Sequence, residues 1–249
     1  MMVIVRVLGR FWLLFVIMAL AISLHAYTAV LRGALTEKGI YTSEDFKRSA
    51  VVRENVRLAN KISSFTSFDT DVFRGKEEAF GGQRVIMLFT HGFRHINWLH
   101  LFVNMAMLLP LGVLTISRIG TARFALLFFS SMALASVCYG LVRPPGVWMA
   151  GASGGIHGLA GAVILWAWID GAGQGRWRLP CLYAAIIALI NVWFWYLTDG
   201  KFAWDLHLAG LIIGAAAAAT LFRKPVSRTH DANSYASRTR NSSLERAAP

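Results

Sequence analysis

Long apolar runs separated by short polar segments make up most of the chain. Six of these runs reach the roughly 20 residues that a helix needs to cross the hydrocarbon core of a bilayer. They are Phe11–Leu31, Trp98–Ile116, Ala122–Val142, Gly151–Ile169, Leu179–Leu197 and Ala203–Phe222. Helices satisfy their own backbone hydrogen bonds in lipid, so the pattern predicts an all-α polytopic membrane protein with six transmembrane helices.

Two long segments lack this pattern. The first, residues 32–90, joins the first two apolar runs and carries charges of both signs. Thr42 and Asp45 resemble a helix start there, and Val52, Val56 and Ala59 recur at helical spacing, which predicts a short amphipathic helix at the membrane surface. The second, residues 223–249, is polar and basic, and we expect it to be a disordered tail.

Composition agrees with a membrane protein, since 56% of the residues are hydrophobic and 15% are charged. A net charge of +12 could indicate nucleic acid, but its placement favours anionic lipid headgroups as the partner instead. The basic residues gather in the loops after the second and fourth apolar runs and after the sixth, namely Arg118, Arg123, Arg176, Arg178, Arg223, Lys224 and Arg228. By the positive-inside rule, both termini are cytoplasmic.

The first apolar run has two possible interpretations, a retained transmembrane helix or a secretory signal peptide. Arg6 and Arg10 before the first apolar run also fit a secretory signal peptide, although the run is long for one and lacks a clean cleavage site. We expect a retained helix, so that residues 1–31 form a cytoplasmic N-terminus and the first span.

Cys138 and Cys181 both lie inside apolar runs, which favours packing as small apolar residues over a disulfide or a metal site.

With the N-terminus inside, the second, fourth and sixth runs all begin at the outer face of the membrane. Each carries polar residues within roughly 10 Å of that start, at about 1.5 Å of rise per residue. These residues are His100, Asn104, Ser153, His157, Asp205 and His207. Polar groups are costly in lipid and tend to mark functional sites, so their common depth predicts a site.

A serine needs a neighbouring base to become a nucleophile, and His207 could serve Ser153 if their helices approach closely. Small residues allow such an approach, and Gly210 and Gly214 follow His207 at the spacing of a GxxxG groove, while Gly154 follows Ser153. This pattern predicts a Ser–His dyad for acyl transfer, with no metal and no organic cofactor.

Acyl transfer also needs hydrogen-bond donors for the developing oxyanion. His100 and Asn104 lie at i and i+4 on one helix face, and the backbone N–H of Ser153 could add a third donor. His157 points roughly parallel to Ser153, so we interpret it as a supporting ring beside His207 and not as the base. Asp205 is interpreted as a favourable charge in the first turn of its helix.

Each of these residues also has a purely structural interpretation. Polar side chains in helix bundles often hydrogen-bond a neighbour, and GxxxG often indicates packing alone. Taken singly, the structural interpretation is the more common one. Their joint occurrence at one depth on three helices of the same direction favours a catalytic site.

Three segments closely resemble the signature segments of rhomboid intramembrane serine proteases. They are FTHGFRHINWLHLFVN at 89–104, GASGGIHG at 151–158 and HLAGLIIG at 207–214. The resemblance covers residues 83 to 222 and implies a six-helix rhomboid-like bundle with its catalytic core at 91–222. It implies Ser153 as nucleophile, His207 as base, and His100 and Asn104 as the oxyanion hole. It also implies an outward-opening, water-filled cavity, with His91 and His95 at a hydrated entrance.

The sequence departs from the family pattern at three places. QRVIML at 83–88 stands where many members have a Trp-Arg pair, His157 replaces a usual Phe or Tyr, and Leu206 replaces a common small residue. These departures bear on loop architecture, rate and selectivity, but all four residues with chemical roles are present.

The leading hypothesis is therefore an intramembrane serine endopeptidase that cleaves transmembrane segments of other membrane proteins. A catalytically silent, pseudoprotease-like protein that binds transmembrane helices is the alternative. A small transporter is a weaker one, because no intramembrane carboxylate or inverted repeat is evident. The resemblance implies transmembrane proteins and lipids as partners, and a bacterial inner membrane is the expected location. The sequence does not indicate a particular substrate or oligomeric state.

Overall fold

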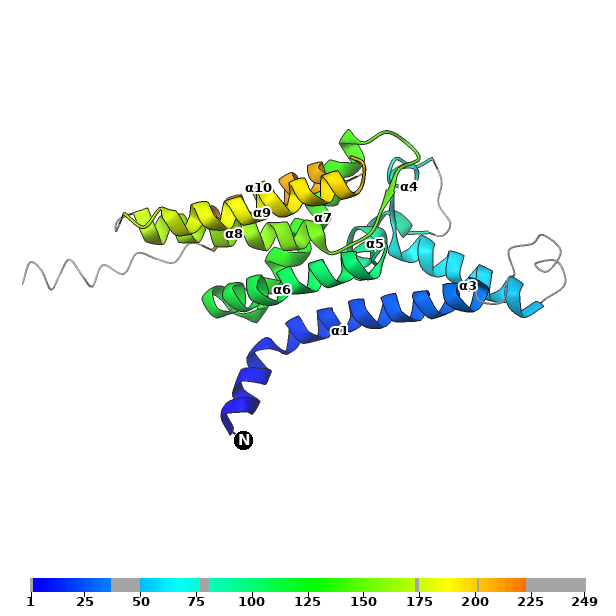
Figure 1. Ribbon diagram of the computed structural model, residues 1–249, viewed down its shortest axis with the longest axis horizontal. Helices are drawn as coiled ribbons and strands as arrows, with labels where there is room; N and C mark the ends of the chain where they lie inside the picture. Colours follow the sequence, from blue (N-terminus) through cyan, green and yellow to red (C-terminus); the bar gives the residue numbers. More distant parts are fainter. Residues whose placement is uncertain (1, 37–49, 77–80, 173–174, 201, 223–249) are drawn as a thin grey trace, which may run out of the picture.

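The computed structural model describes residues 2–36, 50–76, 81–172, 175–200 and 202–222, and this part of the chain is mostly helical (Figure 1). The long helices are α1 (Met2–Thr36), α6 (Trp98–Ile119), α7 (Thr121–Val142), α8 (Ser153–Ala172), α9 (Arg178–Leu197) and α10 (Trp204–Thr220). Each predicted apolar run corresponds to one of them, with ends that differ by a few residues.

Four helical segments of the described chain are long and apolar enough to cross a membrane. They are Gly9–Val30 within α1, and the whole of α6, α7 and α9. The apolar helix α10 is shorter, with 17 residues. In α8, glycines and polar side chains dilute the apolar residues, and every position from Ser153 to Val163 is buried by protein. The helix that carries the GxSG segment thus lies in the interior of the bundle.

The bundle is organised around α8, which packs against α10, α7, α6 and α9. In Figure 1, α8, α9 and α10 lie together, and α1 lies on the far side of α6. Gly112 of α6 makes the contact with α1 close, because a Cβ there would lie 2.7 Å from Leu14 Cδ1. Buried Leu, Ile, Met and Phe side chains fill the space between these helices.

The first residues of α6, α8 and α10 lie at one end of the bundle, which we call the site end (Figure 1). Short elements cover this end: α3 (Ala50–Thr66), β1 (Phe68–Asp69), α4 (Thr70–Phe73), α5 (Gln83–Thr90), the 3-10 helix η1 (His91–Phe93) and β2 (Trp148–Met149). The two strands pair antiparallel, with Phe68 opposite Met149. This pairing joins the segment before α6 to the loop before α8.

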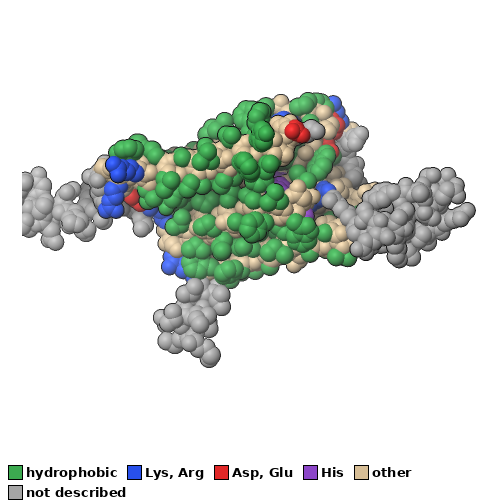
Figure 2. Space-filling model, viewed as in Figure 1, with side chains coloured by type: hydrophobic (Ala, Val, Ile, Leu, Met, Phe, Trp, Pro, Cys, Tyr) green, Lys and Arg blue, Asp and Glu red, His purple; other side chains and the backbone are tan. Residues whose placement is uncertain are grey.

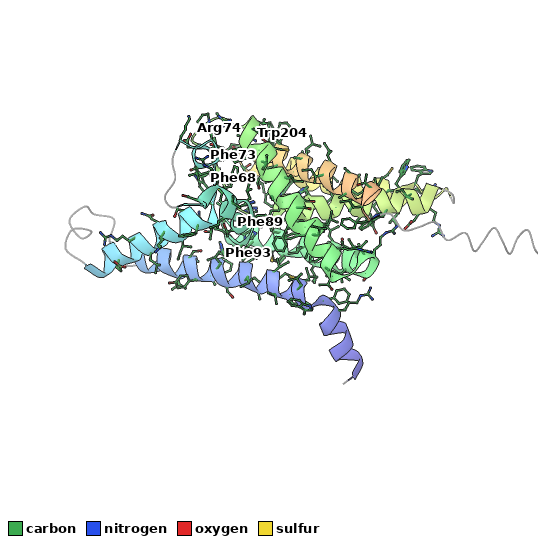
Figure 3. All side chains as sticks on the ribbon, turned by 180° about the vertical axis from the view of Figure 1, so that it is seen from behind. Phe68, Phe73, Arg74, Phe89, Phe93 and Trp204 are labelled. Carbon is green, nitrogen blue, oxygen red and sulfur yellow. The ribbon has the colours of Figure 1, made fainter. Side chains whose placement is uncertain are left out.

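Aromatic packing fastens β1 and α4 to α7. Phe68 and Phe73 lie close together at the site end in Figure 3, with their ring centroids 5.5 Å apart. Both rings rest on Gly140, where a Cβ would lie 2.5 Å from Phe73 and 2.9 Å from Phe68. Arg74 completes the contact, because its guanidinium donates to the Gly140 carbonyl at 3.2 Å.

The exterior of the helices is largely apolar. Figure 2 shows hydrophobic side chains over most of the visible face, with Lys and Arg toward the two ends of the helices. Exposed large side chains occur on every long helix, for example Trp12, Phe102, Leu141, Trp168, Trp193 and Ile212. Cys138 and Cys181, which were expected to pack as small apolar residues within the spans, are free thiols on exposed positions of α7 and α9.

The structure describes part of the segment 32–90, where an amphipathic helix was expected, and none of the tail 223–249. The helix α3 occupies the region where an amphipathic helix was expected, and Ala59 within it is half-buried. Thr42 and Asp45 lie outside the described residues, and so do the side chains of Val52 and Val56. The tail 223–249, expected to be disordered, also lies outside them.

Candidate active site

Backbone contact between α8 and α10 positions the two candidate catalytic residues. A Cβ at Gly214 would overlap the carbonyl group of Gly158, and one at Gly210 would overlap the carbonyl oxygen of Gly154. Gly154 itself has room for a Cβ, at 3.4 Å from Ala135, so its part in the contact is through its carbonyl. The expected glycine groove is therefore present, and it holds the start of α10 against the start of α8.

Ser153 and His207 line the same cavity, which has a volume of about 620 Å³ and lies at the site end. Its wall also includes His100 of α6, Trp148 and Met149 of β2, and residues from the ends of α7 and α9. Ser153 is 8% exposed and His207 is 5% exposed. The two residues predicted to form the dyad thus line one cavity.

Ser153 is the first residue of α8 and lines this cavity. Its carbonyl oxygen accepts a hydrogen bond from His157 Nδ1 at 2.8 Å, whereas no described hydrogen bond involves its hydroxyl. Catalytic hydrogen bonds are often long in proteins without substrate and tighten when it binds. In this structure, then, the Ser153 hydroxyl and the His207 ring share one cavity but form no hydrogen bond with each other.

His207 is held between two other rings. His157 stacks on it with 3.9 Å between ring centroids and an interplanar angle of 13°. Phe202 approaches its other side edge-on, at 4.7 Å and 84°. The sequence interpretation of His157 as a supporting ring beside His207 agrees with this stack, which restricts how the imidazole can turn.

A residue that the sequence reasoning missed links these two histidines. The Oδ1 atom of Asn191, in α9, lies 2.7 Å from His207 Nδ1. The Nδ2 atom of the same side chain lies 3.0 Å from His157 Nε2. Its Nδ2 also donates to the carbonyl of Ile187 at 2.8 Å. No motif marks Asn191, but a single amide in the middle of an apolar helix is a signal in itself, because polar groups there seldom lack a role.

The two expected oxyanion donors differ in position. The ring of His100 lies against Gly151, where a Cβ would come within 3.0 Å of Nε2. Asn97 holds this end of α6, because its side chain caps the helix by accepting from the His100 N–H at 2.8 Å. Asn104 is buried one turn deeper, and its amide donates to the His100 carbonyl at 2.8 Å. The wall of the cavity thus includes His100 but not Asn104.

The expectation that His91 and His95 form a hydrated entrance is wrong. Their side chains are 0% and 1% exposed, and neither lines the cavity. His91 Nε2 is paired with the Ser136 hydroxyl at 2.8 Å, and the His91 carbonyl accepts from Gly151 N–H at 2.9 Å. Burial lowers the pKa of His91 to about 4 and that of His95 to about 3, so both rings are neutral interior groups near pH 7.

Asp205 has a partner that was not foreseen. It lies in the first turn of α10 as expected, and its carboxylate also pairs with Arg143, with Nε and Nη2 each 2.8 Å from one oxygen. Arg143 follows the last residue of α7 and donates to the Phe202 carbonyl at 3.2 Å as well. This bidentate contact fixes the start of α10 two residues before His207.

No cluster of His, Cys, Asp and Glu suited to a metal ion occurs among the described residues. The groups that line the cavity include the Ser153 hydroxyl and the imidazoles of His100 and His207, which are groups used in acyl-transfer chemistry.

Long apolar helices define the class of this protein, an integral membrane protein whose helix bundle contains a cavity lined by Ser153 and His207. A family model for the rhomboid domain matches residues 82–224. This match covers more than half of the chain, so the protein belongs to the rhomboid family, whose members are typically intramembrane serine proteases. A search of curated proteins finds no significant match.

Proposed function

We propose that this protein is an active intramembrane serine endopeptidase that cleaves the transmembrane segments of other membrane proteins. The observation that supports this most is the shared cavity of Ser153 and His207, created by the glycine contact between α8 and α10. The candidate nucleophile and the candidate base come from two helices and line one cavity inside the helix bundle. A purely structural serine and histidine would not need such a cavity between them.

In the proposed reaction, His207 Nε2 takes the proton of the Ser153 hydroxyl as Oγ attacks the carbonyl carbon of the scissile peptide bond. The tetrahedral intermediate collapses when the imidazolium gives this proton to the leaving amine, which breaks the C–N bond. Water then attacks the acyl ester with His207 again as base, and the carboxylate product and free serine result. Every proton is held by protein groups or water, so the reaction needs no cofactor.

Three groups could stabilise the oxyanion of that intermediate. The backbone N–H of Ser153 lies in the first turn of α8, where N–H groups lack partners within the helix. His100 faces the cavity near Gly151. The Asn104 amide would join them by turning one N–H away from its own helix. Each such donor contributes about 3 kcal/mol to lowering the barrier in well-studied acyl transferases.

In this proposal all six long helices cross the membrane, with α8 shielded from lipid by its neighbours and α10 spanning as a shorter helix. The site end faces outward and both termini are cytoplasmic, because Arg118, Arg123, Arg176 and Arg178 lie toward the opposite end. A bacterial inner membrane fits this orientation. Lipids and transmembrane proteins are the proposed partners, and substrates with unstable helices are favoured because a peptide bond inside a stable helix is inaccessible.

Comparison of membrane proteomes from cells that express the wild-type protein or Ser153→Ala tests this proposal. We expect fragments whose new ends fall within transmembrane segments in the wild-type sample, and their absence with Ser153→Ala. Equal amounts of such fragments in both samples would contradict the proposal. Intact membrane proteins that copurify equally with both variants, without any fragments, would instead favour the catalytically silent helix-binding protein.

A further inference from the structure

We infer that Asn191 is a positioning residue that fixes the tautomer of His207, so that Nε2 is the nitrogen able to accept the serine proton. This inference rests on the proposed function for its catalytic consequence. The hydrogen-bond assignment itself follows from the contacts alone, and it can be derived from the two backbone carbonyls at the ends of the network.

The first carbonyl is that of Ile187, which lies 2.8 Å from one side-chain atom of Asn191. A carbonyl oxygen accepts hydrogen bonds and has none to donate, so the atom of Asn191 that faces it is the NH₂ group. The remaining atom of the amide is therefore the oxygen Oδ1, which faces His207 Nδ1 at 2.7 Å. An amide oxygen accepts, so His207 Nδ1 carries a hydrogen.

The second carbonyl is that of Ser153, which lies 2.8 Å from His157 Nδ1. By the same reasoning, His157 Nδ1 is protonated, and in the neutral ring Nε2 is the acceptor. The second N–H of the Asn191 amide points to this nitrogen at 3.0 Å. Both amide hydrogens and the amide oxygen are therefore used, and each end of the network confirms the same orientation of the amide.

The consequence for His207 is chemical. A neutral imidazole with hydrogen on Nδ1 has its lone pair on Nε2, which is the form that a general base requires on that nitrogen. In serine proteases with a third residue, a carboxylate or amide on the far side of the histidine holds the ring in this form. Asn191 occupies the corresponding place here, which converts the predicted dyad into a Ser153–His207–Asn191 arrangement.

The position of Asn191 also gives a role to His157, which replaces the Phe or Tyr usual at this position in the family. His157 stacks on His207 and at the same time accepts from Asn191, so a single amide orients both rings. The network begins at the carbonyl of Ser153 and ends at its proposed base, and it therefore ties the base to the backbone of the nucleophile.

Purified protein in proteoliposomes allows a test with Asn191→Ala, Asn191→Asp and the control Val192→Ala. Val192 is the next residue of α9, is 64% exposed and lies outside the cavity wall. For a cleaved transmembrane substrate, we expect Asn191→Ala to lower kcat about tenfold or more at unchanged KM, as for other partners that orient a functional histidine. Asn191→Asp keeps an oxygen acceptor for Nδ1–H but loses the N–H donors to Ile187 and His157, so its kcat should lie between those of Asn191→Ala and wild type, and Val192→Ala should match wild type.

Solid-state NMR of ¹⁵N-histidine-labelled protein reads the tautomer directly, with the His207 signals assigned by their loss in His207→Gln. We expect Nδ1–H for His207 in the wild-type protein and a loss of this single form in Asn191→Ala. A purely structural role of Asn191 would lower thermal stability without this change in tautomer or a selective effect on kcat.

Several outcomes decide the inference. An Nε2–H form of His207 in the wild-type protein overturns it, and so does an unchanged kcat in Asn191→Ala. If Asn191→Ala fails to fold, the wild-type spectrum and the activity of Asn191→Asp decide in its place. If the wild-type protein cleaves nothing but shows the Nδ1–H form that Asn191→Ala loses, the proposed function fails while the assigned network holds.

Discussion

Backbone carbonyls determine much of the histidine chemistry in this protein. His157 Nδ1 faces the Ser153 carbonyl, and the Asn191 amide that faces Ile187 O sets the state of His207. His25 is placed in the same way, with Nδ1 3.2 Å from the His95 carbonyl. Such contacts hold each imidazole in one orientation within an apolar bundle, where water is scarce and a ring without partners would be costly.

The buried pair His91 and His95 predicts a loss of stability in mild acid. Burial lowers their pKa values to about 4 and about 3, whereas an unfolded chain would have a histidine pKa of about 6.5. Between these values the unfolded state binds more protons, so this stability is intact above about pH 6.5 and falls as the pH drops toward the folded pKa. The slope is about 1.4 kcal/mol per pH unit for each histidine.

Unfolding in detergent, followed between about pH 7.5 and about pH 4.5, measures this slope. His91→Gln and His95→Gln should each make stability less dependent on pH, because each removes one titrating group. The same pH dependence in both variants as in the wild-type protein would show that other groups cause the acid loss.

At the residue scale, the sequence predicted the partners that belong to motifs and missed those that do not. Ser153, His207 and the stacked His157 could be found because glycine spacing and helix direction bring them together. Asn191 could not be paired in advance, because its partners lie on two other helices and depend on the rotation of α9. The interior position of His91 and His95 was missed because β1, α4 and α5 cover the site end through contacts between segments distant in the chain.

Among the helices, the contact of α8 with α10 is the one on which the site depends. Glycines at both sides let the backbones touch, and the pair of Arg143 with Asp205 fixes the start of α10 from the side. Helix association in lipid relies on such close packing, because lipid tails are as apolar as the side chains they replace.

Gly214→Ala is predicted to destabilise the protein although alanine favours helices. The added Cβ would overlap the Gly158 carbonyl group, and crowding of this kind costs about 1–3 kcal/mol. The thermal midpoint and the proteolytic rate should both fall, because α10 carries His207. Ala216→Val adds bulk at an exposed position of the same helix and should change neither. A Gly214→Ala protein with wild-type stability would contradict the account of the glycine contact.

The Arg143–Asp205 pair is predicted to couple the end of α7 to the start of α10. The two side chains are 28% and 11% exposed, and the contact is bidentate, so solvent screens it only in part. A double-mutant cycle with Arg143→Gln and Asp205→Asn should give a favourable coupling of about 1 kcal/mol in the free energy of unfolding. Additive effects of the two substitutions would show that the pair contributes no coupling.

The long helices were predictable as elements, since apolar runs of bilayer length have few other structures open to them. Their ends moved by a few residues, as at α8, which begins at Ser153 and not at Gly151. The two-residue strands β1 and β2 carry no periodic signal, and their pairing joins Phe68 to Met149 across the whole of α6 and α7. Such non-local pairing depends on the finished bundle and has no local signature.

On the scale of the whole molecule, the site end lies opposite the end that carries Arg118, Arg123, Arg176 and Arg178. This asymmetry predicts that the cavity opens outward. In a variant without Cys138 and Cys181, an Ile96→Cys substitution in the cavity wall, at an exposed position, should react with a membrane-impermeant maleimide added to intact cells. Cysteine at Arg176, in the basic loop before α9, should react only after lysis. The reverse pattern would invert the proposed orientation.

The central claim is that Ser153 and His207 act as nucleophile and base. The most direct measurement is peptide mapping by mass spectrometry after reaction with a fluorophosphonate, which phosphonylates an activated serine. We expect an adduct on Ser153 in the wild-type protein, none in Ser153→Ala, and a strong decrease in His207→Ala. An adduct on another serine, or equal labelling of Ser153 in the wild-type and His207→Ala proteins, would contradict it.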